Sequence, residues 1–410
     1  MPDASQTGPG PLTFHLNPNG ARSAPWSAAQ DDILNDTGLT RARATIAAWP
    51  GYAPTPLYPL PGLAARTGIA ALHYKDEGLR FGLGSFKALG GAYAVARLLQ
   101  TQVETRLGQP VPMTAILDGS HADLIAGITV CCATDGNHGR SVAWGAQTFG
   151  CGCVIFIHAT VSGGREAAIA AYGAEVRRTP GNYDDSVRIA QDTAAREGWF
   201  VVSDTSYPGY MAVPKDVMQG YEVMAAEAFD ALDVPPSHIF LQTGVGGMAA
   251  AVTALAKRRW GPERPIIVLC DPDHAACWLE SFRAGRPVAV AGDLDTLQAG
   301  LACGEVSALA WIILTDHSDA ALSVPDTAAV DAMRLLAVPF DNDPPIAAGE
   351  SAVAGLAGLL AAMADGPTRA ALGLTAATRV LVFGTEGDTD PALYQELVGR
   401  SAAQVRAGAA

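Results

Sequence analysis

Short apolar runs alternate with longer amphipathic segments from residue 128 onward, and this alternation constrains the fold more than any other feature of the chain. Strand-like runs and helix-like stretches are expected, in turn, at 128–134, 138–149, 153–157, 163–172, 174–178, 183–196 and 199–203. Strands separated by helices of ten or more residues indicate a parallel sheet with helices on both faces.

A second series of the same kind begins near Val213 with a long helical pattern. Strand-like runs follow at 238–242, 265–269 and 380–383, and a glycine-rich turn and a helix come directly after the first of them. We therefore expect an α/β fold of two domains, each an open and mostly parallel sheet flanked by helices. The two domains should face each other across a cleft.

Three segments do not follow the alternation. The first thirty residues are rich in Pro, Gly, Ser and Asn and lack the apolar run of an export signal, which indicates a partly ordered arm. Residues 104–127 are interrupted by Gly, Pro, His and Asp and are expected to form an irregular insertion. The apolar stretch 352–364 is shorter than the ~20 residues that a membrane span needs, so we expect a buried helix.

The charge of the chain argues against polyanionic partners. With 27 basic and 41 acidic residues the net charge is -14, which repels nucleic acid and anionic lipid, so we expect neither partner. Because the first thirty residues lack the apolar run of an export signal, we expect a cytoplasmic location. Seven cysteines without paired CxxC spacing favour neither a disulfide framework nor a metal site. Whether Cys277 and Cys303 form a redox-sensitive pair is left open.

A glycine-rich loop in mid-chain suggests a phosphate site. Gly244, Val245, Gly246, Gly247 and Met248 follow an apolar strand and open an Ala-rich helix. The backbone N–H groups of such a turn and the helix N-terminus can bind a phosphate, although glycine at this kind of turn is often only structural. Dinucleotide binding is disfavoured because the spacing is not GxGxxG.

Lys87 is the best placed of only four lysines to act as a nucleophile; the others are at 75, 215 and 257. It lies between a polar strand end and an apolar, Gly-rich helix start. Desolvation there is expected to lower the pKa of the amine and make it nucleophilic, as Schiff-base chemistry requires. The competing interpretation is an ordinary solvated helix lysine.

The run 134–140 joins a strand to a helix, so its backbone N–H groups can bind a carboxylate. Thr134, Asp135, Gly136 and His138 are the candidate substrate-binding residues, and Asn137 offers an amide to a phenolic oxygen. A carboxylate inside a carboxylate-binding loop is unfavourable without a cationic partner, so Asp135 is interpreted as functional. For His138 we prefer an orienting or packing role.

With these motifs the chain resembles the tryptophan synthase β-like, or fold type II, pyridoxal phosphate enzymes, and within them the diaminopropionate ammonia-lyases. The similarity extends from about Pro54 to the C-terminus. The strings that carry it lie at 80–87, 134–140, 181–185, 204–207, 218–221, 299–305 and 385–390. Dehydratases of this family usually have serine where Asp135 stands, so the aspartate is the discriminating residue.

The resemblance implies pyridoxal 5'-phosphate as the cofactor. Lys87 would form the Schiff base, residues 244–248 would hold the phosphate, and Asn137 would contact the 3-oxygen. Thr385 would face the pyridine nitrogen, and a hydroxyl there would leave the ring neutral, which suits elimination. The resemblance further implies an N-terminal arm (1–40), a large cofactor-binding domain (41–87 and 211–410), a small domain over the cleft (88–210), and a homodimer.

The implied reaction is loss of ammonia from 2,3-diaminopropionate, which gives aminoacrylate and then pyruvate with a second ammonia. Asp135 and Asp204 would line the pocket and bind the second amine, and Lys87, Asp135 and Asp204 would be the catalytic residues. Two bases on opposite faces would admit both D and L forms. For Glu386 and Asp388 a role in orienting the turn alone is left open. The residues at 206–210 and 305–310 differ from the family pattern and leave the substrate preference open.

Other functions remain alternatives at this point. The nearest is a serine or threonine dehydratase of the same fold, which is disfavoured because neither substrate has a second amine. A sensor with a decayed cofactor site should have lost Lys87 or the glycine loop, and both are present. A nicotinamide oxidoreductase would need a glycine fingerprint after an early strand, which is not found.

Overall fold

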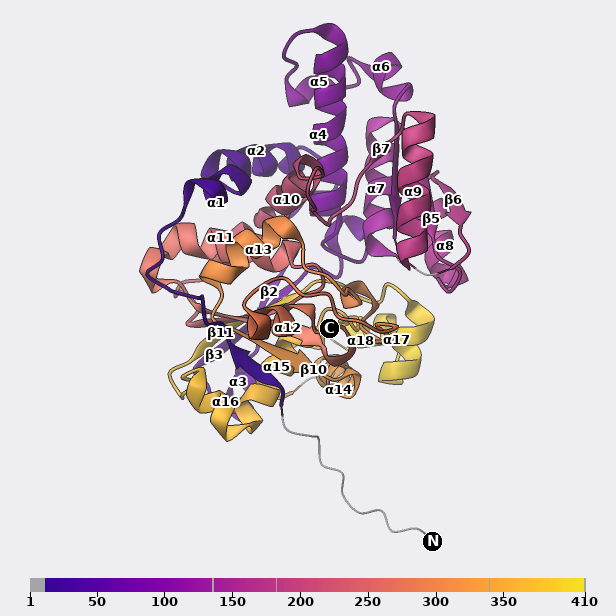
Figure 1. Ribbon diagram of the computed structural model, residues 1–410. Coiled ribbons are helices and arrows are strands. Elements are labelled where there is room, and N and C mark those ends of the chain that lie inside the picture. The colour runs from indigo at the N-terminus through magenta and orange to yellow at the C-terminus, as the bar shows by residue number, and fades with distance from the viewer. Residues whose placement is uncertain (1–11, 135, 182, 339, 409–410) are drawn as a thin grey trace.

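The computed structural model describes residues 12–134, 136–181, 183–338 and 340–408 (Figure 1). Its larger sheet has seven strands in the order β1-β10-β9-β8-β11-β3-β2. Their bounds are Phe14–Leu16 (β1), Ala320–Val324 (β10), Ile266–Pro272 (β9), His238–Gln242 (β8), Arg379–Gly384 (β11), Ala71–Asp76 (β3) and Leu57–Pro59 (β2). The five central strands are parallel, and each edge strand is antiparallel to its neighbour.

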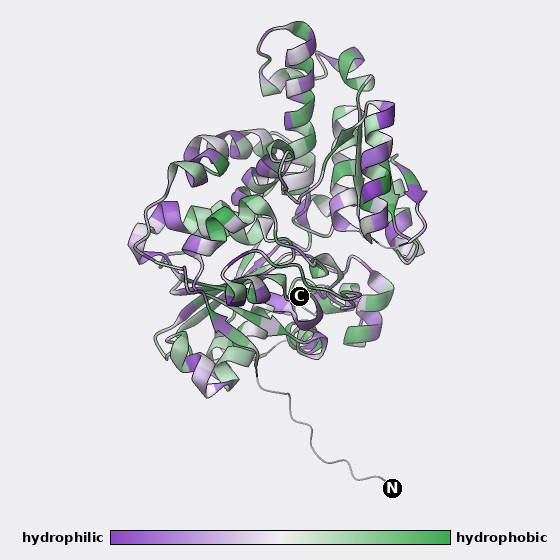
Figure 2. Ribbon diagram, in the orientation of Figure 1, coloured by the Kyte–Doolittle hydropathy of each residue, from purple (hydrophilic) through white to green (hydrophobic). Residues whose placement is uncertain are grey.

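The smaller sheet is parallel throughout and has the order β6-β5-β4-β7. Its strands are Glu175–Arg178 (β6), Gly152–Ile157 (β5), Thr129–Ala133 (β4) and Phe200–Val201 (β7), and the connecting helices are Asn137–Phe149 (α7), Gly163–Ala170 (α8) and Tyr183–Glu197 (α9). The predicted alternation is therefore confirmed, although β7 is shorter than the expected 199–203. Hydrophilic and hydrophobic residues alternate along α9, as expected for a helix with one face on a sheet (Figure 2).

The remaining helices pack around the larger sheet, lie between the two sheets or, as α5 and α6 do, lie at the far end of α4 beside the smaller sheet (Figure 1). They are Ala28–Ile33 (α1), Asp36–Ala47 (α2), Pro61–Thr67 (α3), Ala88–Leu107 (α4), Met113–Leu117 (α5), Ala122–Ala126 (α6), Ala212–Asp230 (α10), Gly247–Trp260 (α11), Cys277–Ala284 (α12), Ala308–His317 (α13), Asp326–Ala337 (α14), Ala354–Ala364 (α15), Gly366–Ala371 (α16), Pro391–Val398 (α17) and Ala402–Ala407 (α18). The predicted buried helix at 352–364 is α15. Of the described helices, none has both the length and the apolar character to cross a bilayer.

Helices α4 and α10 pack closely and join the two sheets (Figure 1). A Cβ on Gly220 of α10 would lie 1.8 Å from the Leu89 carbonyl oxygen of α4, so only glycine permits this approach. Helix α4 begins directly after Lys87. The position of the lysine is therefore fixed by a helix that is buried between both sheets.

The irregular insertion expected at 104–127 is wrong. Helix α4 continues to Leu107, and two short helices, α5 and α6, follow it. The Glu104 side chain accepts a hydrogen bond from the Val111 N–H (3.0 Å), which closes the turn between α4 and α5. Buried Ile116 and Ile125 attach the two short helices to the core.

Three strands of the larger sheet were not predicted: β2 at one edge, and β1 and β10 at the other. The described part of the N-terminal arm contributes β1, which pairs with β10 through Phe14 and Leu322. Strand β10 lies between α13 and α14 and is buried along its whole length. Both strands extend the larger sheet at one edge, while the proposed boundaries of the domains stay a prediction.

Candidate active site

The candidate residues come from the carboxyl ends of neighbouring strands. The loop after β3 leads to Lys87, the glycine loop follows β8, and Thr385 follows β11; β11 lies between β3 and β8. Carboxyl ends of parallel strands meet at one edge of a sheet, which is where open α/β sheets bind ligands. The Phe86 N–H donates to the Thr385 carbonyl oxygen (3.0 Å), so the lysine loop and the turn after β11 are in direct contact.

Lys87 forms an ion pair with Asp204. The Nζ atom lies 2.6 Å from Asp204 Oδ2, and the two side chains are only 19% and 17% exposed. Burial alone lowers the pKa of Lys87, but the charge of Asp204 and its hydrogen bond to the amine outweigh burial, so the pKa lies above its ordinary value. The expectation of a lowered pKa is therefore wrong, because it considered desolvation without the paired carboxylate.

Asp204 is ionised at neutral pH. Burial raises the pKa of Asp204, but Lys87 and His138 together hold it well below its usual range. His138 Nε2 donates to the Val202 carbonyl oxygen (2.7 Å), and its Nδ1 lies 3.8 Å from Asp204 Oδ2. His138 is buried and, in line with the orienting role preferred for it, lies beside the carboxylate rather than at the open side of the site.

Two aromatic rings that were not singled out as site residues enclose the Lys87 amine. Lys87 Nζ lies 5.4 Å from the Phe86 ring centroid and 5.8 Å from that of Tyr221. Burial raises the pKa of the Tyr221 phenol, so the ring stays neutral. Tyr221 ends the string 218–221 that contributed to the family resemblance, which was the available signal for it.

The glycine loop presents an open helix N-terminus. Helix α11 begins at Gly247, and no side chain among the described residues caps it. Gly246 has φ +97°, and a Cβ there would lie 2.2 Å from Trp278. The backbone conformation and Trp278 therefore both require glycine at this position.

Polar side chains at the start of α12 form hydrogen bonds with the glycine loop. Trp278 Nε1 donates to the Gly244 carbonyl oxygen (3.1 Å), and Cys277 Sγ donates to the same oxygen (3.5 Å). Asp271 accepts hydrogen bonds from Thr243 Oγ1 and the Trp278 N–H. Because Cys277 is a free thiol, the disulfide left open between Cys277 and Cys303 is not formed here.

Thr385 is buried and accepts a hydrogen bond from Gln242 Nε2 (2.8 Å). Gln242 is the last residue of β8, and the sequence analysis did not single it out. Its signal was an amide at the end of an otherwise apolar strand-like run, directly before the glycine loop.

The loop after β4 is ordered by its own threonine. Thr134 Oγ1 accepts from the N–H groups of Gly136 (3.1 Å) and Gly139 (3.2 Å). Asn137 Nδ2 donates to Glu386 Oε2, which joins the small sheet to the turn after β11. Asp135 lies outside the described residues.

Glu386 and Asp388 hold the turn after β11. Glu386 Oε1 also accepts from the Ser351 N–H (2.9 Å), and Arg406 donates to Asp388 (2.7 Å). These contacts support the orienting role that the sequence left open for both residues. In the part of the chain that the structure describes, no three His, Cys, Asp or Glu side chains are grouped to hold a metal ion.

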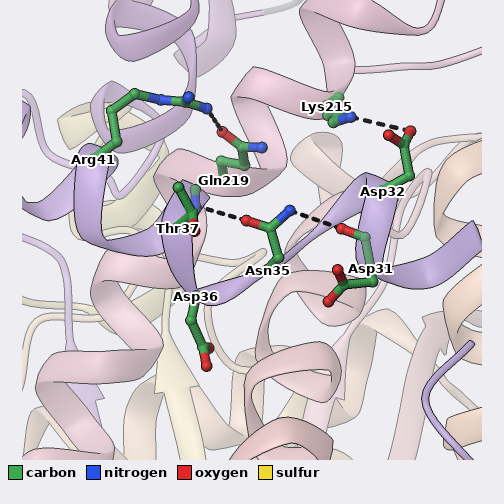
Figure 3. A pocket seen from close by; sticks show the side chains of 9 residues that line it. Asp31, Asp32, Asn35, Asp36, Thr37, Arg41, Lys215 and Gln219 are labelled. Atoms are coloured by element: carbon green, nitrogen blue, oxygen red, sulfur yellow. Dashed lines mark hydrogen bonds and ion pairs between the residues drawn. The ribbon is translucent and has the colours of Figure 1, made fainter. Parts of the chain in front are cut away.

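A wide surface pocket of about 600 Å³ lies elsewhere, between α1, α2 and α10 (Figure 3). Its polar side chains contact one another: Lys215 pairs with Asp32 (3.1 Å), and Arg41 donates to Gln219 (2.9 Å). Asn35 accepts from the Gly38 N–H and caps α2. None of the residues predicted for the site lines it, so this pocket is not the candidate active site.

The residues present at the strand ends suit a pyridoxal phosphate group. Lys87 supplies a primary amine, the uncapped N-terminus of α11 suits a phosphate dianion, and Thr385 supplies a hydroxyl. A Cβ at Gly247 would lie in ordinary van der Waals contact with Met218, at 3.6 Å, and with the Asp204 carbonyl oxygen, at 3.9 Å.

Comparisons with known proteins agree with this chemistry. The model of the family "Pyridoxal-phosphate dependent enzyme" matches residues 48–375. Diaminopropionate ammonia-lyase of Escherichia coli K12 is 41% identical over 361 residues, which cover 85% of this chain and 88% of the relative. The crystal structure of the selenomethionine-containing holo enzyme from Escherichia coli superposes with a TM-score of 0.85 and 35% identity, over 94% of this chain and 96% of that one.

A second crystal structure from Escherichia coli, in complex with an aminoacrylate-PLP azomethine reaction intermediate, matches with a TM-score of 0.83 and 35% identity over 94% of this chain and 96% of that one. The predicted fold type II architecture and the pyridoxal phosphate cofactor are thereby confirmed. This chain belongs to the pyridoxal-phosphate dependent enzymes and, among them, to the family of the diaminopropionate ammonia-lyases.

Proposed function

We propose that this protein is an ammonia-lyase that removes the β-amine of 2,3-diaminopropionate. The first products are ammonia and 2-aminoacrylate, and aminoacrylate with water gives pyruvate and a second ammonia. The observation that carries the proposal is the ionised Asp204 carboxylate beside Lys87 at a largely buried site. The second amine of diaminopropionate would pair with this carboxylate, whereas the hydroxyl of serine carries no charge to pair.

The chain's own groups would divide the proton chemistry between them. Bound pyridoxal phosphate supplies an electron sink that makes the α-proton of the substrate acidic. Lys87 Nζ is the proposed base for one stereoisomer, and the high pKa that Asp204 gives this nitrogen lets it carry the proton to the leaving amine. Asp204 cannot donate that proton, because its lowered pKa leaves the carboxylate unprotonated at neutral pH.

The other roles follow the contacts of the site. The N-terminus of α11 at residues 244–248 would hold the phosphate, Asn137 the 3-oxygen and Thr385 the ring nitrogen. The N–H groups of the loop 134–138 would bind the substrate carboxylate. Asp135 is the proposed second base, on the face opposite Lys87, which would allow turnover of both D and L forms.

An assay of both diaminopropionate stereoisomers, with serine as the comparison, tests the function. Pyruvate and ammonia are measured together in each reaction. We expect two ammonia for each pyruvate from diaminopropionate and a much smaller kcat/KM for serine. Faster turnover of serine, with one ammonia for each pyruvate, would assign the protein to the dehydratases instead.

Lys87→Ala tests the amine assignment. We expect the variant to lose the absorbance band of the lysine-bound cofactor and the elimination activity, because Lys75, the other lysine near the carboxyl end of a site strand, is held in a buried ion pair with Glu227. Lys215→Ala is the matched control, since Lys215 pairs with Asp32 at the surface pocket. If the band survives in Lys87→Ala, or disappears in Lys215→Ala, the assignment of Lys87 is wrong.

A homodimer and a cytoplasmic location complete the proposal. The homodimer is supported by the resemblance to the family. Light scattering of the purified protein measures the first, and cell fractionation measures the second.

A further inference from the structure

The amide of Gln242 has only one orientation that satisfies its surroundings. Its Nε2 atom lies 2.7 Å from the Phe383 carbonyl oxygen and 2.8 Å from Thr385 Oγ1. A carbonyl oxygen only accepts hydrogen bonds, so the nitrogen, and not the oxygen, of the amide must face Phe383. The same nitrogen then donates its second hydrogen to Thr385, because its third neighbour, the Ala352 carbonyl oxygen, lies farther away at 3.4 Å.

The hydroxyl of Thr385 is thereby restricted to one direction. Its oxygen accepts the hydrogen from Gln242, so its own hydrogen must point away from the amide. Gln242 and Thr385 are both buried, at 3% and 4% exposed, so water does not compete for these groups. Thr385 can therefore act toward a ligand at the strand ends as a donor.

We propose that Gln242 is a positioning residue that keeps the ring nitrogen of the bound cofactor unprotonated. By accepting from Gln242, Thr385 presents its hydrogen to the nitrogen, and a nitrogen that accepts this hydrogen bond cannot carry its own proton. The inference rests on the proposed position of the ring nitrogen beside Thr385, and it adds the residue that decides the direction of that hydrogen bond.

A purely structural role explains Gln242 less well. Its Oε1 atom is buried and has no hydrogen-bond partner among the described residues. A buried acceptor without a partner destabilises the fold, and an apolar side chain would avoid that cost. An amide at this position is therefore better explained by the polarity of its nitrogen toward Thr385 than by stability.

Gln242→Glu reverses the polarity with almost no change of shape. A buried carboxyl group at this position stays protonated, because burial disfavours its charged form. It can donate to the Phe383 carbonyl and accept from the Thr385 hydroxyl, which withdraws the hydroxyl hydrogen from the ring nitrogen. Gln242→Met removes the amide and serves as the second variant if the first does not fold.

The readout is the ¹⁵N chemical shift of the ring nitrogen in holoenzyme reconstituted with ¹⁵N-labelled pyridoxal phosphate. In the parent, the signal should lie at the unprotonated position at neutral pH. In Gln242→Glu, the pH at which the nitrogen takes up a proton should rise by about one unit, a tenfold change that corresponds to one hydrogen bond. Gln242→Met should shift this pH in the same direction by less.

Gln298→Glu is the matched control. Gln298 is also buried with an unpartnered Oε1 among the described residues, and its Nε2 contacts Asp326 (3.2 Å) rather than Thr385. This variant should leave the ring nitrogen unchanged. A protonated ring nitrogen in the parent, or equal protonation behaviour in the parent, Gln242→Glu and Gln242→Met, would overturn the inference. No substrate is needed, so the result stands whether or not diaminopropionate is turned over.

Discussion

The charge state of Lys87 is set by a residue 117 positions away in the chain. Desolvation and the Asp204 carboxylate act on the amine in opposite directions, and the carboxylate prevails. The pair thus stores a proton next to the place where an amine would leave. Folding lowers the pKa of Asp204. The stability that its carboxylate contributes is therefore fully present at a pH above the ordinary aspartate pKa, and it is lost only as the pH falls through the lowered pKa.

Asp204→Asn should lower kcat/KM for diaminopropionate by about ten- to a hundredfold, the value of one hydrogen bond to a charged group. Without the carboxylate, burial acts on Lys87 against a weaker opposing charge, so the pKa of the amine should also fall. Steady-state kinetics measured as a function of pH give both results.

The control for this variant is Asp216→Asn. Asp216 pairs with Arg97 at a similar exposure, 21% for each side chain, and has no contact with the site. We expect its kcat/KM to match the parent. Equal losses in the two variants would mean that Asp204 contributes only to the stability of the fold.

At the scale of elements, local sequence patterns predicted most strands and helices. The same patterns did not predict which residues far apart in the chain would be in contact. The alternation at 128–203 is visible in sequence because each strand and helix has its own period. The helices within 104–127 were missed because α5 and α6 are too short to show a helical period. The pairing of Lys87 with Asp204, and of Asn137 with Glu386 across 249 positions, has no local signal, so only the resemblance brought these residues together.

A buried ion network fixes the loop that carries Lys87. Glu227 of α10 accepts from Lys75 Nζ (2.7 Å) on β3 and from Arg80 Nη2 (2.6 Å) in the loop, and Arg80 also pairs with Glu77 (2.7 Å). All four side chains are at most 3% exposed. Charges buried in this way depend on one another, because each loses its compensation when a partner is removed.

Glu227→Gln should therefore lower the free energy of unfolding by about 3–5 kcal/mol, the usual cost of breaking a buried pair. The Glu227 pKa is lowered in the fold, so the difference from the parent should be largest above the ordinary carboxyl pKa and shrink as the pH falls. Denaturant unfolding at several pH values measures it.

Asp230→Asn, three residues further along α10, is the comparison for this network. Asp230 pairs with Arg43 and Arg259 at the surface, where such pairs contribute about 0–1 kcal/mol. A loss in Asp230→Asn as large as that in Glu227→Gln would contradict the assignment of a special role to the buried network.

The glycine loop gives a second prediction at this scale. Gly246→Ala should weaken cofactor binding, because the Cβ would meet Trp278 at 2.2 Å and φ +97° is strained for alanine. Gly366→Ala at the start of α16 is the control, since a Cβ there meets nothing within 4 Å. Titration with pyridoxal phosphate measures the affinity, and an unchanged affinity in Gly246→Ala would show that the turn tolerates the side chain.

For the whole molecule, the link between the two sheets is polar where it passes the site. Arg165 of α8 pairs with Glu350 of the larger part (3.2 Å), next to the contact of Asn137 with Glu386. Glu350 is only 4% exposed. Burial raises the pKa of Glu350 most, the nearby charge of Glu386 raises it further, and the resulting pKa is about 8. Two carboxyl groups at one junction thus make the contact between the two sheets sensitive to pH.

Glu350→Gln should remove this sensitivity. Because the pKa of Glu350 is raised from 4.5 to about 8 by folding, its stabilising contribution is complete at low pH and is lost as the pH rises between these two values. Gln cannot ionise, so the stability of the variant relative to the parent should increase with pH, by at most about 1.4 kcal/mol for each pH unit. Exposed Glu396→Gln should follow the parent throughout. The test is the free energy of unfolding of the parent and the variants, measured between pH 4.5 and about 8. A difference between Glu350→Gln and the parent that stays constant over this range would mean that Glu350 is already ionised in the folded protein.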